Sequence, residues 1–210
     1  MKKGILVALE GIDGSGKSTQ AVLLKLHLER QHISTRIIKA KSKKMDKPFN
    51  DFVEAVGLLP DSLGYMFAYQ VLHRKQYERT VEAVDRGEVV IADRWNTSFF
   101  IYHNQFGSLA NQTQKTRDMI DSITFDNLCP DLCVFLDVPV NISFTRRIIR
   151  GDKSDFSEEE KSFYENVRQE YLRIVKHNGW VVIDGCSPVE IVHQEIFRNL
   201  EHCFKQKRSE

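Results

Sequence analysis

The sequence predicts an α/β fold in which helices flank a doubly wound, five-stranded parallel sheet. Five short apolar runs, most of them rich in Val and Ile, alternate with longer stretches of helical periodicity. Continuous apolar character over so few residues is typical of strands that are buried on both faces, as in a parallel sheet. Such alternation implies right-handed crossovers and a ligand site beyond the carboxyl ends of the strands.

The expected elements follow one another along a single domain that spans residues 1–210. The spacing of Val22 and Leu26 places both on the apolar face of the first helix. The polar segments 39–47 and 151–160 are expected to be loops, and loops on such a core are candidate binding elements. We expect strands at 5–9, 36–39, 89–92, 132–137 and 180–183, and helices at 17–31, 63–86, 140–150, 157–177 and 188–204.

Composition narrows the class of protein. Of 210 residues, 41% are apolar and 28% are charged, which is typical of a soluble globular chain. A net charge of +1 gives no general attraction to nucleic acid or to an anionic membrane, and no apolar run approaches the roughly 20 residues that a membrane span needs. The four cysteines have neither redox-motif nor zinc spacing, so we expect reduced thiols and a cytoplasmic protein.

A phosphate-binding loop follows the first expected strand. Residues 11–18 read Gly-Ile-Asp-Gly-Ser-Gly-Lys-Ser and match the pattern G-x-x-x-x-G-K-S, with a helical pattern directly after them. Glycines let the backbone amides approach phosphate oxygens, and the helix N-terminus adds positive charge. Lys17 is expected to reach the β and γ phosphates of ATP, and the Ser18 hydroxyl to ligate Mg²⁺. The expected ATP-binding residues are Gly11, Asp13, Gly14, Ser15, Gly16, Lys17, Ser18, Thr19 and Arg146.

The end of the third strand suggests which reaction such a loop serves. The run Val-Val-Ile-Ala ends in Asp93 and Arg94, and no Asn-Lys-x-Asp motif of a GTPase is present. An aspartate beside a phosphate loop can hold Mg²⁺, and an arginine at the same strand end can hold a second phosphate group. This pairing suits phosphoryl transfer between two bound nucleotides in a P-loop NTPase-type fold.

With these residues in view, the sequence resembles the thymidylate kinases, within the nucleoside monophosphate kinases. The resemblance runs over nearly the whole chain. It rests on residues 9–20 around the phosphate loop, on Asp-Arg-Trp at 93–95 where the family has Asp-Arg-Tyr, and on the spacing of Ser98 and Tyr102. Weaker matches are the strand region 130–139, the helix around 163–172 and the adenine-side loop at 184–188.

The resemblance implies roles for several residues. Asp13 matches the carboxylate that contacts the acceptor sugar, and Arg94 matches the arginine on the acceptor phosphate. Tyr102 matches the tyrosine that favours deoxyribose, and Asp93 matches the carboxylate near Mg²⁺. The resemblance further implies ATP and a deoxynucleoside monophosphate, first of all dTMP, as substrates, and a homodimer as the assembly.

Three departures from the family pattern bear on the site. The family's Thr-Arg-Glu-Pro-Gly-Gly segment is replaced by a lysine-rich one, in which Lys41 can carry the charge of the missing arginine but not its planar geometry. The family's lid arginine has no counterpart in 154–158, and His103 stands where the family has Gln.

The lid, expected at about 150–160, should supply a cation that closes over the transferred phosphoryl group. The phosphate loop carries Gly14 and Ser15 and so offers no arginine of its own. Arg150 and Lys153 are the expected catalytic cations beside Lys17, Arg94 and Asp93. Arg146 shares a helical face with Arg150 and is expected near adenine.

The resemblance further implies that the acceptor base lies on the long helix after residue 63, where the family has a Phe that stacks on the base and an Arg that touches its edge. Phe67, Gln70 and Arg74 lie at i, i+3 and i+7 and therefore share a face. Phe67 can stack on a base, and the Gln70 amide can both donate to and accept from its edge. The expected acceptor-binding residues are Asp13, Lys41, Phe67, Gln70, Arg74, Arg94, Ser98, Tyr102 and His103.

Three alternative functions stay open at this point. His103 and the altered base pocket fit a monophosphate kinase of another base specificity. A deoxynucleoside kinase is disfavoured, because the second strand ends in lysines rather than in the carboxylate base that a hydroxyl acceptor needs. A nucleotide-binding regulator without catalysis is consistent with the missing lid arginine.

Overall fold

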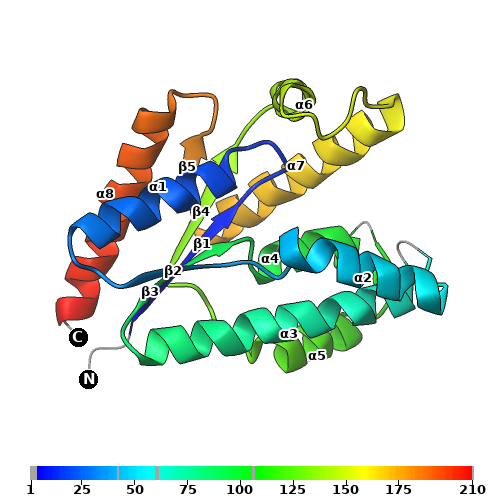
Figure 1. The fold of residues 1–210 in the computed structure, drawn as a ribbon, viewed down its shortest axis with the longest axis horizontal. Helices are drawn as coiled ribbons and strands as arrows, with labels where there is room; N and C mark the ends of the chain where they lie inside the picture. The colour runs from blue at the N-terminus through cyan, green and yellow to red at the C-terminus, as the bar shows by residue number, and fades with distance from the viewer. Residues whose placement is uncertain (1–3, 42, 60–61, 106, 210) are drawn as a thin grey trace.

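The computed structural model describes residues 4–41, 43–59, 62–105 and 107–209. Its centre is a sheet of five parallel strands in the order β2-β3-β1-β4-β5, which confirms the predicted fold class (Figure 1). The strand that carries the phosphate loop is therefore central. The strands are β1 (Ile5–Glu10), β2 (Thr35–Ile38), β3 (Val89–Asp93), β4 (Leu132–Asp137) and β5 (Val181–Asp184).

Helices cover both faces of this sheet. On one face α1 and α8 pack side by side, and α3, α5 and α7 cover the other (Figure 1). Among the described residues, no helix has the length and apolar character that crossing a membrane needs. The helices are α1 (Lys17–Arg30), α2 (Lys43–Val56), α3 (Leu63–Asp85), α4 (Asn96–Phe99), the π-helical turn η1 (Phe100–Gln105), α5 (Gln114–Phe125), α6 (Val140–Ile149), α7 (Glu158–Asn178) and α8 (Val189–Ser209).

Alternation along the strands divides the core between the two faces. In β1, Ile5, Val7 and Leu9 pack toward α1 and α8, whereas Leu6 and Ala8 pack toward α3. All five side chains are at most 3% exposed, as expected for a strand with a helical layer on each side. This burial fixes the strand register and so holds the loop that follows β1 in place.

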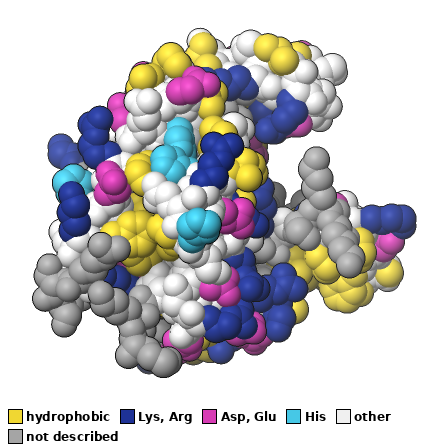
Figure 2. All heavy atoms as spheres, turned by 60° about the vertical axis from the view of Figure 1, so that its left-hand side comes forward, with side chains coloured by type: hydrophobic (Ala, Val, Ile, Leu, Met, Phe, Trp, Pro, Cys, Tyr) yellow, Lys and Arg dark blue, Asp and Glu magenta, His cyan; other side chains and the backbone are white. Residues whose placement is uncertain are grey.

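The first helix differs from its prediction in which face is buried. Val22 and Leu26 are 50% and 47% exposed, while Ala21, Leu24 and Leu28 are fully buried against the sheet and α8. The two apolar sets lie on adjacent stripes of one helix, and the sheet position alone decides between them. Figure 2 shows the surface around α1 and α8, where hydrophobic side chains lie among histidines and charged groups.

Two expected loops are shorter than predicted. The segment expected to be a loop at 39–47 contains the start of α2 at Lys43, because Met45, Phe49, Phe52 and Val56 follow helical spacing behind a lysine-rich start. Phe49 is 5% exposed and meets the rings of α3, which anchors this helix. The expected lid lies between α6 and α7, and a capping box of Ser157 and Glu160 begins α7 at Glu158.

Candidate nucleotide site

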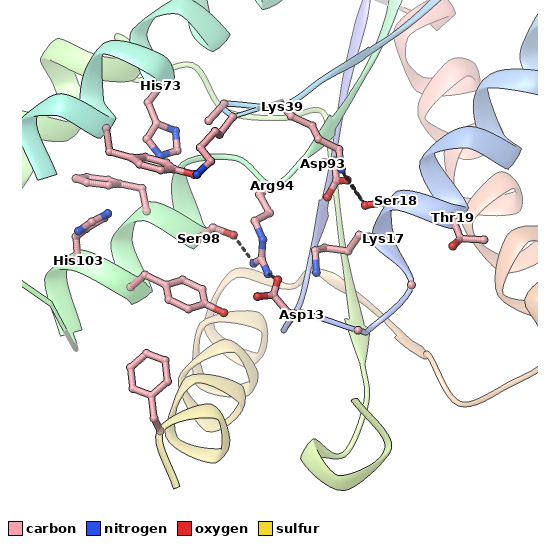
Figure 3. Close-up of a pocket in the computed structure, with 18 of the residues that line it drawn as sticks. Asp13, Lys17, Ser18, Thr19, Lys39, His73, Asp93, Arg94, Ser98 and His103 are labelled. Carbon is pink, nitrogen blue, oxygen red and sulfur yellow. Dashed lines mark hydrogen bonds and ion pairs between the residues drawn. The ribbon is translucent and has the colours of Figure 1, made fainter. Parts of the chain in front are cut away.

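A cavity of about 520 Å³ lies beyond the carboxyl ends of β1 and β3 (Figure 3). One end of it is charged and the other is lined by rings. The phosphate end is formed by Asp13, Gly14, Gly16, Lys17, Ser18, Thr19, Lys39, Ala40, Lys41, Asp93, Arg94 and Arg150. The aromatic end is formed by Tyr65, Tyr69, His73, Phe99, Tyr102, His103 and Phe163, with Ser98 between the two ends.

The phosphate loop has the backbone that its glycines predict. Gly11, Gly14 and Gly16 have φ angles of 141°, 81° and 100°, which L side chains rarely adopt. A Cβ atom at Gly14 would also lie 2.7 Å from the Ser143 carbonyl oxygen of α6. The glycine pattern is therefore required by this fold, and Gly11 and Ser15 shape the loop without lining the cavity.

Lys17 is folded onto the loop that precedes it. Its Nζ donates to the carbonyl oxygens of Gly11 and Ile12 at 2.8 and 2.7 Å. Burial, together with repulsion from Arg94, lowers the pKa of Lys17 to about 7, although the neighbouring carboxylates oppose this change. An anionic phosphate at this position would compensate the buried ammonium.

Ser18, Asp93 and Lys39 form a compact cluster at the end of β3. The Ser18 hydroxyl donates to Asp93 at 2.6 Å, and Lys39 Nζ lies 2.9 Å from the same hydroxyl and forms an ion pair with Asp93. The lysine ammonium therefore occupies a position in which a cation contacts both a hydroxyl oxygen and a carboxylate oxygen. These oxygen donors fit Mg²⁺, which prefers hard ligands and retains several waters. No cluster of three or more His, Cys, Asp or Glu side chains that would hold a metal occurs in the described ranges.

Arg94 joins the phosphate loop to the third strand. It has a φ of 75°, and its guanidinium donates to Asp13 at 2.5 Å, to Ser98 at 3.0 Å and to Tyr171 at 3.3 Å. Burial by itself would raise the pKa of Asp13, but the charges of Arg94 and Lys17 hold it well below its usual range. Asp13 is thus ionised and orients Arg94. Figure 3 shows the two side chains pointing toward each other.

A second carboxylate, which no sequence motif indicated, shares the hydrogen-bond partners Ser98 and Tyr171 with Arg94. Glu10 is fully buried at the end of β1 and accepts from Ser98 at 2.5 Å, from the Trp95 amide at 2.8 Å and from Tyr171 at 3.1 Å. Burial raises the pKa of Glu10, while these donors and Arg94 oppose the rise. A charged residue at the end of a fully apolar run was the available signal.

The aromatic end is built on one face of α3. Tyr65, Tyr69 and His73 recur every four residues and all line the cavity. The ring of Tyr69 lies 5.2 Å from that of His73 and 6.3 Å from that of His103 in η1. Flat rings around an apolar cavity are suited to stacking on a nucleobase.

The residues predicted to form the base-reading face of α3 lie away from the cavity. Phe67 is 57% exposed, Gln70 accepts from Thr124 at 2.9 Å, and Arg74 donates to the Ile123 carbonyl at 2.9 Å. None of the three lines the cavity, because α3 is rotated so that this stripe faces α5 and solvent. Tyr102, His103 and Ser98, in contrast, line it as expected.

The expected lid cations separate in space. Arg150 lines the cavity and donates to Asp152 at 2.8 Å, whereas Lys153 lies outside the lining and is bound to Glu160 at 2.7 Å. Arg146 donates to the Gly185 carbonyl at 2.9 Å, so it connects α6 with the loop after β5.

Arg147 is a further cation on the lid side, outside the predicted set of site residues. Its guanidinium lies 4.5 Å from the ring centre of Phe156 and 5.0 Å from that of Tyr164. Its charge helps to hold the pKa of Asp13 low. Helical spacing could not single it out from Arg146, since only the packing of α6 on α7 shows which guanidinium turns toward the aromatic rings.

The fold and the site together define a phosphate-loop nucleotide kinase: a phosphate loop after β1, an Asp-Arg pair after β3, and one cavity that continues from these charges to a compartment of rings. Comparison with known proteins gives the family. The chain belongs to the thymidylate kinase family, whose model, described as "Thymidylate kinase", matches residues 9–196.

Named relatives align with this chain over nearly their full length. A thymidylate kinase of Fervidobacterium nodosum is 30% identical over 92% of this chain and 97% of its own. A thymidylate kinase of Caldanaerobacter subterraneus is 28% identical over 97% of this chain and 98% of its own. A probable thymidylate kinase 1 of Saccharolobus solfataricus is 32% identical over 91% and 94% of the two chains.

Proposed function

We propose that this protein transfers the γ-phosphoryl group of ATP to the 5′-phosphate of a deoxynucleoside monophosphate, with dTMP the first candidate, giving ADP and dTDP. The observation that carries this proposal is one cavity in which Arg94, at the phosphate end, contacts Ser98, where the aromatic end begins. A phosphate loop alone serves many reactions, but a second phosphate-binding arginine facing an aromatic compartment suits a nucleotide acceptor. Membership of the thymidylate kinase family supports the same reaction.

On the donor side, the amides of the phosphate loop and the Lys17 ammonium would surround the β and γ phosphates. Ser18 and Asp93 would hold Mg²⁺, which supplies charge neutralisation between the donor phosphates when it is bound. Lys39 must then leave its present contacts with both residues. Arg146, between the phosphate loop and the loop after β5, lies on the expected adenine side.

On the acceptor side, Arg94 and Lys41 would bind the monophosphate, and Asp13 keeps Arg94 oriented. The attacking phosphate oxygen is already anionic at neutral pH, so no proton-abstracting base is needed. Positioning and charge then provide the rate enhancement. Arg150 is the lid cation best placed to act on the transferred group, because it already lines the cavity. Tyr102, beside the sugar position, would favour deoxyribose, as the family resemblance implies.

The proposal is tested by ADP release from Mg-ATP with dTMP, dUMP, dCMP, dAMP, dGMP, the ribonucleotides and thymidine. We expect turnover with dTMP to exceed that with thymidine by a wide margin. Preference for another monophosphate would keep the mechanism and change the substrate. Consumption of thymidine would indicate a nucleoside kinase, and ATP binding without turnover across the panel would indicate a regulator.

We further propose that the protein forms a homodimer through α3 and α5. Phe67, Val71, Met119 and Ile123 are each more than half exposed, and the two helices pack against each other. Adjacent apolar helices offer a patch that two copies can share about a twofold axis. Sedimentation should show a dimer, and Val71→Asp combined with Ile123→Asp should give a monomer; a monomeric parent would contradict this assembly.

ATP use and four free thiols favour the cytoplasm.

A further inference from the structure

His73 is held in one orientation at the aromatic end of the cavity. Its side chain is 5% exposed, lines the cavity and meets the rings of Tyr69, Phe99 and Phe125 at 5.2, 5.7 and 5.4 Å between centroids. Figure 3 shows it on the same side as His103 and across from the charged groups. A ring packed in this way presents a defined edge to whatever occupies the aromatic end.

A chain of hydrogen bonds fixes which nitrogen of this ring carries the proton. The Gln76 side chain is 1% exposed, and its Nε2 donates to the Arg94 carbonyl oxygen at 2.8 Å. Only the amide nitrogen can donate to a carbonyl, so the orientation of the Gln76 amide is determined. Its Oε1 therefore faces His73 Nδ1, at 3.3 Å. An amide oxygen only accepts, so Nδ1 must be the protonated nitrogen.

The remaining nitrogen of His73 is consequently a hydrogen-bond acceptor. Burial lowers the pKa of His73 to about 4, even though the bond to Gln76 opposes this change, so the ring is neutral at pH 7. A neutral imidazole with Nδ1 protonated carries a lone pair on Nε2. Among the described residues, the one hydrogen bond that His73 makes joins its Nδ1 to Gln76, and Nε2 is left for a ligand.

We infer that His73 selects the acceptor base by accepting a hydrogen bond from its ring N–H, and that Gln76 is the positioning residue that maintains this state. The inference rests on the proposed function and specifies the substrate class of the same site. Thymine and uracil carry N3–H, and guanine carries N1–H. Cytosine and adenine present a lone pair at the corresponding ring atom, which would face a second lone pair on Nε2.

Leaving two acceptors opposed in a buried site costs more than losing one neutral hydrogen bond, which is why polar pockets discriminate strongly. The backbone carbonyl of Arg94 is the first acceptor of this hydrogen-bond chain, and the guanidinium of the same residue is the group proposed to bind the acceptor phosphate. The residue proposed to bind the phosphate would thus also set the protonation state of the group proposed to recognise the base.

The inference is tested directly in the unmodified protein by ¹⁵N NMR of the histidine rings, with His73→Asn used only to assign the signal. We expect Nδ1 of His73 to be protonated and Nε2 to be unprotonated in the nucleotide-free protein. Saturating dTMP should move the Nε2 resonance in the direction of an accepted hydrogen bond, whereas ADP alone should not. A proton on Nε2, or an Nε2 resonance unmoved by dTMP, would overturn the inference.

Kinetics provide a second readout. His73→Phe keeps a ring but removes the acceptor, so the KM for dTMP should rise about tenfold with kcat changed less than about threefold. Discrimination between dTMP and dCMP should fall by about the same factor, and His73→Gln should restore part of it. His202→Gln on the exposed side of α8 is the matched control and should change neither.

Gln76→Leu tests whether Gln76 maintains the tautomer of His73, because this variant removes the hydrogen bond to Nδ1 and leaves His73 itself in place. It should allow the other tautomer of His73 to appear in the NMR spectrum and should raise the KM for dTMP, while Gln76→Glu retains an acceptor for Nδ1. An unchanged tautomer in Gln76→Leu would overturn the positioning role.

The two levels of the proposal fail in different ways. Turnover of dTMP with an unmoved Nε2 resonance would support the kinase activity and overturn the role of His73 in base recognition. A shift of the Nε2 resonance with dTMP but without turnover would support the role of His73 in base recognition and overturn the kinase activity. Two results would overturn the role of His73 in base recognition. One is preferred turnover of dCMP or dAMP, and the other is an Nε2 resonance that no monophosphate moves.

Discussion

The two ends of the cavity are built in opposite ways. At the phosphate end the charged groups already pair with one another: Arg94 with Asp13, and Lys39 with Asp93. These groups come from the loop after β1 and from the ends of β2 and β3. At the aromatic end the rings come from α3, α4, η1 and α7, and the buried His73 is neutral. The first end is organised by charge and the second by packing.

This difference separates what each end contributes. Charges that are fixed before substrate arrives stabilise the charge that develops during phosphoryl transfer, so the phosphate end should control kcat. Rings that bind the ground state and the transition state alike should control KM and base choice. Substitutions at the two ends should therefore divide between these two kinetic parameters, and the largest effects should lie at the phosphate end.

Lys17→Met should have the largest effect. The variant keeps most of the buried side-chain volume but removes the ammonium, so kcat/KM with ATP and dTMP should fall by about 10³-fold or more. Lys25→Met, on the exposed side of the same helix, is the matched control. Steady-state kinetics with circular dichroism decides: a folded Lys17→Met enzyme of near-normal rate would exclude the assigned role of the loop.

Arg94→Lys should have the next largest effect. Lysine retains the charge but not the planar fork that reaches Asp13, Ser98 and Tyr171 together, so kcat/KM should fall by about 10²-fold. Arg79→Lys on α3, which is exposed, should leave the rate unchanged. Equal rates in Arg94→Lys and the parent would show that position 94 acts only as a point charge.

The burial of neutral His73 at the aromatic end should make the free energy of unfolding depend on pH. The pKa of His73 is about 4 in the folded protein, against about 6.5 for an unperturbed histidine. Between these values the unfolded chain binds more protons, so the free energy of unfolding falls as pH falls through this window, by about 2 kcal/mol from pH 7 to pH 5. Urea unfolding of His73→Gln should lack this component. A variant that loses as much stability as the parent over this range would place the proton uptake elsewhere.

Arg150→Ala should have a smaller effect than Arg94→Lys, a fall in kcat of about tenfold, because Arg150 is partly exposed and must move from Asp152 to reach the transferred phosphoryl group. Lys153→Ala should change kcat less than twofold, since Lys153 is held by Glu160 outside the cavity. Single-turnover rates of the two variants compare these residues directly. A larger loss in Lys153→Ala would mean that the lid rearranges when nucleotides bind.

The same contrast explains how far the site was predictable from the sequence. The phosphate end depends on short motifs at the ends of two strands, so the sequence predicts that Lys17, Ser18, Asp93 and Arg94 lie together, and all four line one cavity. The aromatic end depends on the rotation of α3 about its axis. A shift of one or two residues in helical phase moves Phe67 out and Tyr69 in, and no local signal fixes that phase.

Other differences have the same origin. Val22 and Leu26 share an apolar face of α1 as predicted, but this face is half exposed, because two apolar stripes run along the helix and only packing selects the one that is buried. The first residues of α2 were predicted to be a loop, because they are rich in lysine and the apolar positions with helical spacing begin only after them. Glu10 was missed because its partners, Ser98 and Tyr171, lie far away in the sequence and meet it only in the folded chain.

The central claim is that the two ends are halves of one site, with donor and acceptor bound together for direct transfer. Calorimetric titration with adenosine and thymidine joined through five phosphates tests it most directly. We expect one molecule bound per chain, and a dissociation constant at least about 100-fold below that of ATP or dTMP alone, because one association replaces two. Binding of two molecules per chain, or no gain over the separate nucleotides, would contradict a single continuous site.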